Sequence, residues 1–233
     1  SGFTLTELVV VIIVLSAIGI ATSSYISTGV SIYTDISERD RELNSTRFVM
    51  ERLRRDILNA LPNSLSVSTD KQCLTFTPII KSSIYSYDFP ISPLTAVSAT
   101  VATISDYSFT TGDKAVVYLL DESELSSTKV QAISSLSGEV ITFTGSASFP
   151  LASPSKRFYI INEEKSYYFT ASELILADGC GLSGSVMADD ITGEFDVAEP
   201  TLQRNGLAKA TFMLDFDGQE VPIEQTLHVN NVP

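Results

Sequence analysis

The sequence is poor in the residues that most metal sites and nucleophilic sites require. Its 233 residues include one histidine, two cysteines and no tryptophan. These numbers exclude a thiolate zinc cluster, a site with several histidines and a c-type haem motif. Basic residues are also scarce, because 15 Lys and Arg stand against 28 Asp and Glu, for a formal net charge of −13. Phosphate binding needs a concentrated cationic surface, so this balance argues against nucleic acid as a partner.

The first part of the chain lacks positive charge and is strongly apolar. No Lys or Arg precedes Arg39, which excludes the basic n-region of an ordinary secretory signal peptide. From Leu8 to Ala21 every residue is apolar or small except Ser16. A helix over this stretch is long enough to cross most of the hydrocarbon core of a bilayer. The sequence therefore predicts a transmembrane helix over residues 3–24.

Glu7 is the exception in this apolar stretch. An ionisable side chain one turn into a membrane helix costs several kcal/mol and is rarely kept without a partner. We therefore expect a cation near Glu7, supplied by this chain or by another. The alternative is a single-pass anchor in which the glutamate is incidental.

The helix is expected to continue well beyond the apolar stretch. No proline occurs between Phe3 and Pro62, and residues 25–61 form an amphipathic continuation with a charged face of mixed sign. The apolar or small residues of its other face recur at a three-four spacing: Ile36, Leu43, Thr46, Met50, Leu53, Ile57 and Ala60. A helix from Phe3 to Leu61 would be about 88 Å long. No compact domain contains such a helix whole, so its first half must be buried in lipid or in other copies.

Residues 62–233 predict an acidic body made of antiparallel sheet, which carries about −12 of the net charge. Short runs rich in β-branched and aromatic residues alternate with Ser, Thr, Gly and Pro. The strands are expected at Leu65–Val67, Cys73–Ile79, Lys114–Leu120, Lys129–Ile133, Val140–Phe143, Arg157–Ile161, Ser166–Thr170, Glu173–Leu176, Gly193–Val197, Leu207–Phe216 and Val221–Val229. The fold class is thus α+β, a long N-terminal helix packed on an antiparallel head.

Two parts of this body stand out. The last two strands flank an Asp217-Gly218 turn signal and predict a terminal hairpin whose apolar side packs on the amphipathic helix. Residues 80–155 are rich in Ser and Thr and contain four prolines, so we expect them to form an insertion on the sheet.

The segment Gly2-Phe3-Thr4-Leu5-Thr6-Glu7, followed by the apolar run, resembles the processing and assembly signature of type IV pilins and pseudopilins. The resemblance implies the type IV pilin fold. It also implies that a prepilin peptidase cleaves between Gly2 and Phe3 and that Phe3 becomes N-methylated, so residues 1–2 would be a leader remnant. Glu7 would then neutralise the amino group of Phe3 in the neighbouring subunit. A carboxylate and an ammonium that are each too costly alone in hydrocarbon become tolerable as a pair.

Three shorter strings narrow the resemblance to minor pilins. They are RRDILNALPNS at 54–64, CLTF at 73–76 and HVNNVP at 228–233, and they are similar to the MshO group of the mannose-sensitive haemagglutinin (MSHA) pilus system. Wider relatives are the PilW-type minor pilins and the J-type pseudopilins of type II secretion. The implied function is to help prime or cap assembly of a type IV pilus.

The same resemblance implies partners and a location. The partners are a prepilin peptidase, other minor pilins, the major pilin, the inner-membrane assembly platform and the membrane itself. The location is the bacterial inner membrane, with one membrane pass and a periplasmic head, and then the pilus on the cell surface. The alternatives are a J-type pseudopilin and a pilus-tip adhesin or binding module, for which residues 80–155 would be the binding part.

Enzymatic activity is not expected. A Ser-His-Asp or Cys-His arrangement would have to use His228, which the alternation places on the polar side of the last strand. A solvent-facing strand histidine explains it better, because no nucleophile-elbow or oxyanion motif is present. An anchored hydrolase is therefore the least favoured function.

Two further features remain open. Asp189, Asp190, Glu194 and Asp196 offer several carboxylates over a short stretch, a weak candidate calcium site without the twelve-residue EF-hand pattern; no other cofactor is expected. Cys73 and Cys180 either form a disulfide or remain separate buried thiols. A disulfide would close a loop of about 107 residues, worth about 4 to 5 kcal/mol in the chain-entropy model.

Overall fold

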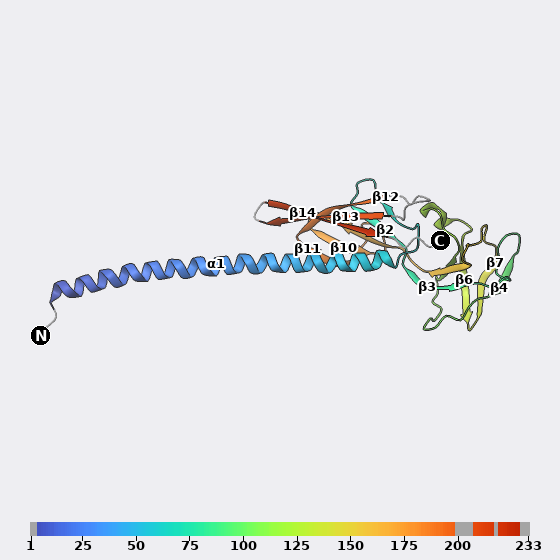
Figure 1. Cartoon of the computed structure of the whole chain (residues 1–233), viewed down its shortest axis with the longest axis horizontal. Coiled ribbons are helices and arrows are strands. Elements are labelled where there is room, and N and C mark those ends of the chain that lie inside the picture. The colour runs from blue at the N-terminus through green and yellow to red at the C-terminus, as the bar shows by residue number, and fades with distance from the viewer. Residues whose placement is uncertain (1–3, 199–206, 217–218, 229–233) are drawn as a thin grey trace. The chain divides into compact units, whose positions relative to one another are not determined.

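The computed structural model describes residues 4–198, 207–216 and 219–228 (Figure 1). The chain divides into two compact units, one up to Arg47 and one from Phe48 onward. A single helix begins in the first unit and ends in the second. We describe each unit by itself.

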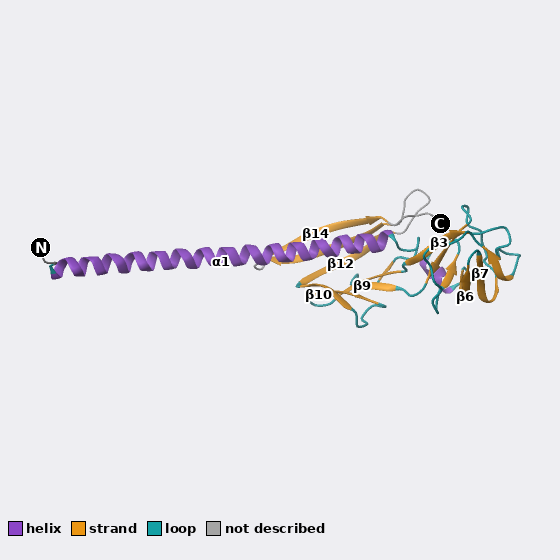
Figure 2. Cartoon of the chain, turned by 90° about the horizontal axis from the view of Figure 1, so that it is seen from below, coloured by secondary structure: helices purple, strands orange, loops and turns teal. Residues whose placement is uncertain are grey.

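The first unit is helical from Leu5 onward. Helix α1 spans Leu5–Leu58 and contains 54 residues (Figures 1 and 2), about 81 Å at 1.5 Å per residue. The prediction of one uninterrupted helix is confirmed, with each end within three residues of the expected position. Hydroxyl groups inside the apolar stretch donate to carbonyls one turn back, as in Ser16 Oγ to the oxygen of Ile12 at 2.7 Å. Such bonds satisfy polar side chains within an apolar helix.

The helix ends inside the second unit for local reasons. Pro62 cannot continue the hydrogen-bond ladder, and Asn63 adopts a left-handed backbone with φ of 62°. Arg55 stands in the last turn, where a cation complements the helix dipole. Near the end of the helix Leu53, Ile57 and Ala60 are buried, as the three-four spacing predicted. Val49 is fully buried in place of the expected Met50, which is half-buried, and Ile36 at the start of the expected face is 57% exposed.

A five-stranded antiparallel sheet with strand order β1-β2-β9-β10-β11 forms one layer of the second unit, and Figure 2 labels its strands β9 and β10. Its strands are β1 (Ser66–Val67), β2 (Cys73–Phe76), β9 (Lys165–Phe169), β10 (Glu173–Ala177) and β11 (Ser185–Asp189). The helix end attaches to this sheet, because the hydroxyl of Tyr167 on β9 donates to Oδ2 of Asp56 at 2.6 Å. A helix packed on antiparallel sheet confirms the α+β class.

A second, three-stranded sheet has the order β12-β13-β14. Its strands are β12 (Ile191–Ala198), β13 (Leu207–Phe216) and β14 (Gln219–His228). Rings join the two sheets, since Phe169 of β9 stacks on Phe195 at 4.9 Å and meets Phe212 edge-on at 6.0 Å. The expected terminal hairpin is confirmed as β13 paired with β14, and its turn at 217–218 lies outside the described residues.

The segment between β2 and β9 forms a sheet of its own. Its strand order is β3-β8-β5-β6-β7-β4, and a short helix η1 (Glu122–Ser126) precedes β6. The strands are β3 (Ile79–Ile84), β4 (Ala96–Thr100), β5 (Lys114–Val116), β6 (Val130–Ser137), β7 (Val140–Ala147) and β8 (Arg157–Ile161). The insertion expected over 80–155 is therefore six strands of regular structure from Ile79 to Ile161.

The two outer strands of this sheet meet and close it into a small barrel. Just beyond β3 and β4, Tyr85 lies opposite Val101. The amide of Ala102 donates to the carbonyl of Ile84 at 2.8 Å, and that of Ser86 to the carbonyl of Thr100 at 3.0 Å. The contact is confined to these ends of the two strands, because no ladder joins the rest of β3 to β4.

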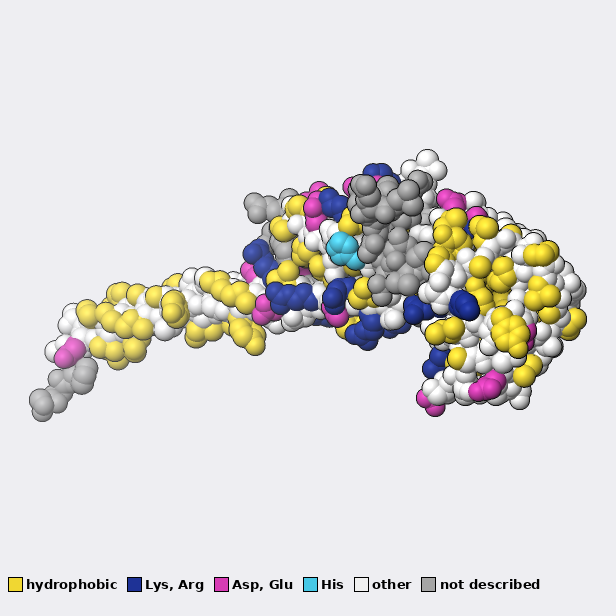
Figure 3. Space-filling view, turned by 45° about the vertical axis from the view of Figure 1, so that its right-hand side comes forward, with side chains coloured by type: hydrophobic (Ala, Val, Ile, Leu, Met, Phe, Trp, Pro, Cys, Tyr) yellow, Lys and Arg dark blue, Asp and Glu magenta, His cyan; other side chains and the backbone are white. Residues whose placement is uncertain are grey.

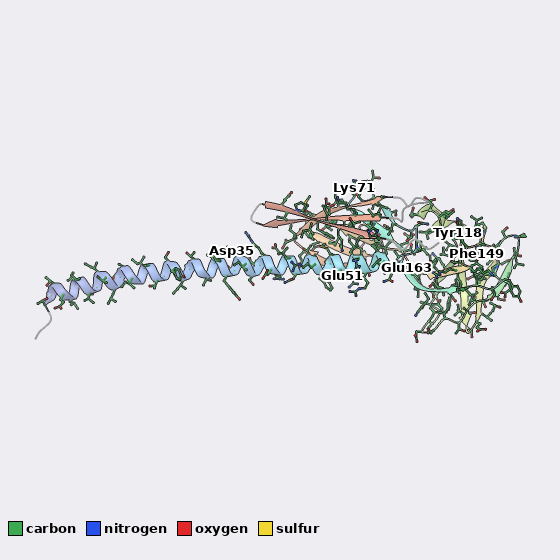
Figure 4. All side chains as sticks on the ribbon, in the orientation of Figure 1. Asp35, Glu51, Lys71, Tyr118, Phe149 and Glu163 are labelled. Atoms are coloured by element: carbon green, nitrogen blue, oxygen red, sulfur yellow. A yellow bond between two sulfur atoms is a disulfide. The ribbon has the colours of Figure 1, made fainter. Side chains whose placement is uncertain are left out.

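Aromatic side chains fill the barrel. Phe89 stacks on Tyr85 at 4.5 Å and on Phe149 at 5.3 Å, and it meets Phe143 edge-on at 5.8 Å. Phe149, labelled in Figure 4, is fully buried. The outer face of the barrel carries a separate cluster that includes Leu61, from the chain after α1. Residues 79–161 thus have their own hydrophobic core.

Three differences from the expected strands have physical causes. The strand expected at Cys73–Ile79 is divided at Pro78, which has no amide hydrogen and marks the change from one sheet to the other. Strands β4 and β11 were not expected, because AVSAT and SVMAD are short and only weakly alternating. Strand β4 pairs with the distant β7, whereas β11 pairs with β10, the strand just before it in the chain.

Candidate functional site

The N-terminal helix presents an apolar surface that no other described part of the chain covers. Large side chains from Leu5 to Ile36 are exposed, with Ile12, for example, 55% accessible. In Figure 3 hydrophobic side chains cover this part of α1. The helix is long and apolar enough to span a membrane. An uncovered apolar surface of this length calls for lipid or for other helices.

Glu7 is placed in the first turn of α1. Its amide donates to the carbonyl of Thr4 at 3.2 Å, so the helical turn is already formed there. A carboxylate in the first turn is favoured by the helix dipole. Among the described residues Glu7 has no ion-pair partner, and the expected processing residues Gly2 and Phe3 lie outside them. The pairing of Glu7 with Phe3 of a neighbour thus stays a prediction.

Cys73 and Cys180 form a disulfide, which decides between the two arrangements that the sequence left open. Their Cα atoms are 6.0 Å apart, and 107 positions separate them in the chain. Cys73 begins β2, whereas Cys180 lies in the loop between β10 and β11. Since β9 lies between β2 and β10, the disulfide ties this loop across the five-stranded sheet.

The four acidic residues of the candidate calcium site do not form a cluster. Glu194 and Asp196 are exposed on the same side of β12, and Asp196 pairs with Lys71 at 3.4 Å. Asp189 ends β11 and Asp190 makes the turn between the strands, with φ of 52°. Across residues 4–198, 207–216 and 219–228, no group of three or more His, Cys, Asp or Glu side chains is placed to hold a metal ion. The geometry gives the calcium expectation no support.

His228 ends β14 opposite Leu207 and is exposed. This placement agrees with a solvent-facing strand histidine. Among the residues whose burial the structure describes, the most enclosed carboxylate lies elsewhere, in the barrel, and sequence reasoning missed it. Asp113 is 1% exposed and accepts hydrogen bonds from three donors: the Tyr107 hydroxyl at 2.6 Å, the Thr110 amide at 2.9 Å and Asn162 Nδ2 at 2.8 Å.

The members of this polar cluster form hydrogen bonds with one another. Burial and then the hydrogen bond to Asp113 raise the pKa of Tyr107 above its ordinary value. With three donors around one buried carboxylate, the cluster fixes the loop before β5 against the end of β8. The cluster therefore has a structural role, and we call it the Asp113 clasp. Because Asp113 and Asn162 are 49 positions apart, no local sequence pattern indicates it.

Comparison with known proteins gave no match to a family model, to a curated protein or to a solved structure.

Proposed function

We propose that this chain is a minor pilin, a structural subunit that helps prime or cap assembly of a type IV pilus of the MSHA kind. The observation that carries the proposal is the exposed apolar surface of α1 with a single carboxylate in its first turn. Such a surface is stable when it lies in lipid or is packed among other helices, and a fibre core supplies the second environment. The GFTLTE signature, which resembles that of type IV pilins, supports a pilin subunit over other membrane-anchored proteins.

In this proposal the mechanism is packing rather than chemistry. The helix holds the subunit in the bacterial inner membrane, with the head in the periplasm, until a prepilin peptidase has cleaved the chain before Phe3. Glu7 then pairs with the N-methylated amino group of a neighbouring subunit and sets the stagger between helices. The head contacts other minor pilins and the major pilin.

Mass spectrometry of surface fibres sheared from the native host tests the proposal. We expect a peptide that begins at N-methylated Phe3, together with co-purifying major pilin. A chain that keeps Gly2 attached to Phe3, or one confined to the membrane fraction without a fibre partner, would contradict it. A processed chain found only with a type II secretion complex would favour a J-type pseudopilin instead.

A second candidate is a pilus-tip binding module carried on a pilin-like stalk. The specific observation in its favour is the closed barrel at residues 79–161, with its own aromatic core. A priming role places no obvious demand on such an added module. Replacing residues 79–161 by a short linker separates the two: fibres that still form but lose attachment favour the binding module, whereas loss of fibres favours priming.

A further inference from the structure

A groove lies in the second unit where the barrel meets the five-stranded sheet. Its apolar floor consists of Leu125, Val130 and Ile161, from η1, β6 and β8. Its rim includes Glu163 and Glu164, from the connection between β8 and β9, and Figure 4 labels Glu163 at this junction. The groove therefore combines an apolar floor with an acidic rim, and it is separate from α1.

The rim charges are available to a ligand. Glu163 and Glu164 are exposed and form no ion pair with any residue that the structure describes. A third carboxylate on the rim, Asp178, is paired with Lys165. Lys114 also lines the groove, so the lining carboxylates outnumber its cation. A bound group of positive charge would be favoured at this rim.

Thr77 places an unpartnered hydroxyl at the groove, which is independent of the rim charges. Its residue is 1% exposed and lines the groove, yet its Oγ1 has no hydrogen-bond partner among the described residues. The backbone of Thr77 is fully used, because its amide donates to Ser64 Oγ at 3.2 Å and its carbonyl accepts from the Leu61 amide at 2.8 Å. A buried hydroxyl without a partner is uncommon in a folded protein and calls for an explanation. A donor placed in the groove would supply one.

A second acceptor on the groove wall is held rigidly. Nδ2 of Asn162 is bound to Asp113 at 2.8 Å, which orients the side chain. Gly112 lies beside its Oδ1 with φ of 101°, and a Cβ at that position would come within 3.1 Å of the oxygen. Glycine therefore keeps the space next to Asn162 open. The wall thus offers a fixed acceptor before any ligand arrives.

We propose that this groove binds a lysine side chain presented by a partner protein. The four methylenes of lysine would cover the apolar floor, and its ammonium carries three donors for the carboxylates and for the Thr77 and Asn162 oxygens. Neither a neutral sugar nor an anion matches both the floor and the charge of the rim. The proposal stands whether or not the chain is a minor pilin, because it uses no residue of α1.

Methyl NMR on the full chain in detergent micelles tests the proposal, with pentalysine as the probe and pentaglutamate as its opposite-charge control at 0.15 M salt. We expect pentalysine to shift the methyl signals of Thr77, Val130 and Ile161 and pentaglutamate to leave them unchanged. The double variant Glu163→Gln/Glu164→Gln should weaken pentalysine binding by about tenfold, as expected when charged partners are neutralised. Thr77→Val should weaken it by about threefold while keeping the chain folded, since valine has the shape of threonine without the hydroxyl.

Glu194→Gln is the matched control, because it removes an exposed carboxylate on β12, outside the groove. It should leave the affinity for pentalysine unchanged. Equal weakening by Glu194→Gln and by the rim variant would show that pentalysine only follows the acidic surface as a whole, and it would overturn the proposal. So would methyl signals that do not move, or a Thr77→Val variant that binds as tightly as the original chain.

Discussion

The hydroxyl of Tyr167 and the carboxylate of Asp56 are joined by a hydrogen bond of 2.6 Å between residues 111 positions apart. Tyr167 is fully buried on β9, and Asp56 stands in the last turns of α1, with Arg52 Nε 3.9 Å from the same oxygen. The contact ties the end of the helix to the middle of the five-stranded sheet. This hydrogen bond holds the end of α1 and strand β9 together.

Removing this hydroxyl should destabilise the second unit. Tyr167→Phe keeps the buried ring but leaves the Asp56 carboxylate without its donor, so we expect a loss of about 1 to 2 kcal/mol in the free energy of unfolding. Thermal unfolding followed by circular dichroism measures it. Tyr87→Phe is the control, because Tyr87 is 95% exposed and should not matter. Equal melting temperatures for the two variants would contradict the assigned role.

The buried tyrosines also predict a loss of stability at alkaline pH. Burial, and then hydrogen bonds to Asp56 and Asp113, raise the pKa of Tyr167 and Tyr107 above the ordinary value of about 10. The folded state then keeps protons that the unfolded state releases. The contribution to stability is complete below about pH 10 and is lost as the pH rises further. Urea unfolding between pH 8 and pH 11 should show this decline, and a Tyr107→Phe/Tyr167→Phe chain should show a shallower one.

Asp113 should be the most sensitive carboxylate of the barrel. Asp113→Ala leaves three donors without an acceptor in a buried site, so we expect a loss of about 3 kcal/mol or more. Asp196→Ala removes only a surface ion pair with Lys71 and should change stability little. Chemical denaturation compares the two. A barrel that tolerated both changes equally would show that the Asp113 cluster is not a clasp.

The disulfide should contribute strongly to equilibrium stability. It joins positions 107 residues apart, and the chain-entropy model gives about 4 to 5 kcal/mol for a loop of this size. Cys73→Ala/Cys180→Ala should lower the urea midpoint, and reductant should then have no additional effect. If the original chain unfolds at the same urea concentration with and without reductant, the disulfide does not stabilise this fold.

Glu7 should matter for assembly and not for folding. Glu7→Gln keeps the size of the side chain but removes the charge, so under the minor-pilin proposal we expect at least about a tenfold drop in fibre-associated protein. Processing at Phe3 should persist, because it precedes assembly. Quantitative immunoblots of sheared fibres and of membranes measure both. Glu38→Gln, on the same helix, should assemble normally, and normal assembly of Glu7→Gln would argue against the pairing with a neighbour.

The long helix could be predicted almost to the residue because its signals are local. An apolar run, a three-four spacing and the absence of proline before Pro62 each act over a few turns. The hairpin at Leu207–His228 was equally legible, since strict alternation on both sides of a turn signal leaves few other pairings. The GFTLTE signature can likewise be identified from the sequence alone.

Tertiary structure decided what depends on residues far apart in the chain. Closure of the barrel needs Tyr85 beside Val101 and Ile84 beside Ala102, and the short strands involved carry almost no preference of their own. The partner of Cys73, the enclosure of Asp113 and the hydroxyl of Thr77 at the groove are decided in the same way. Helical periodicity is fixed within a few residues, whereas sheet closure and grooves arise from contacts that only the complete packing creates.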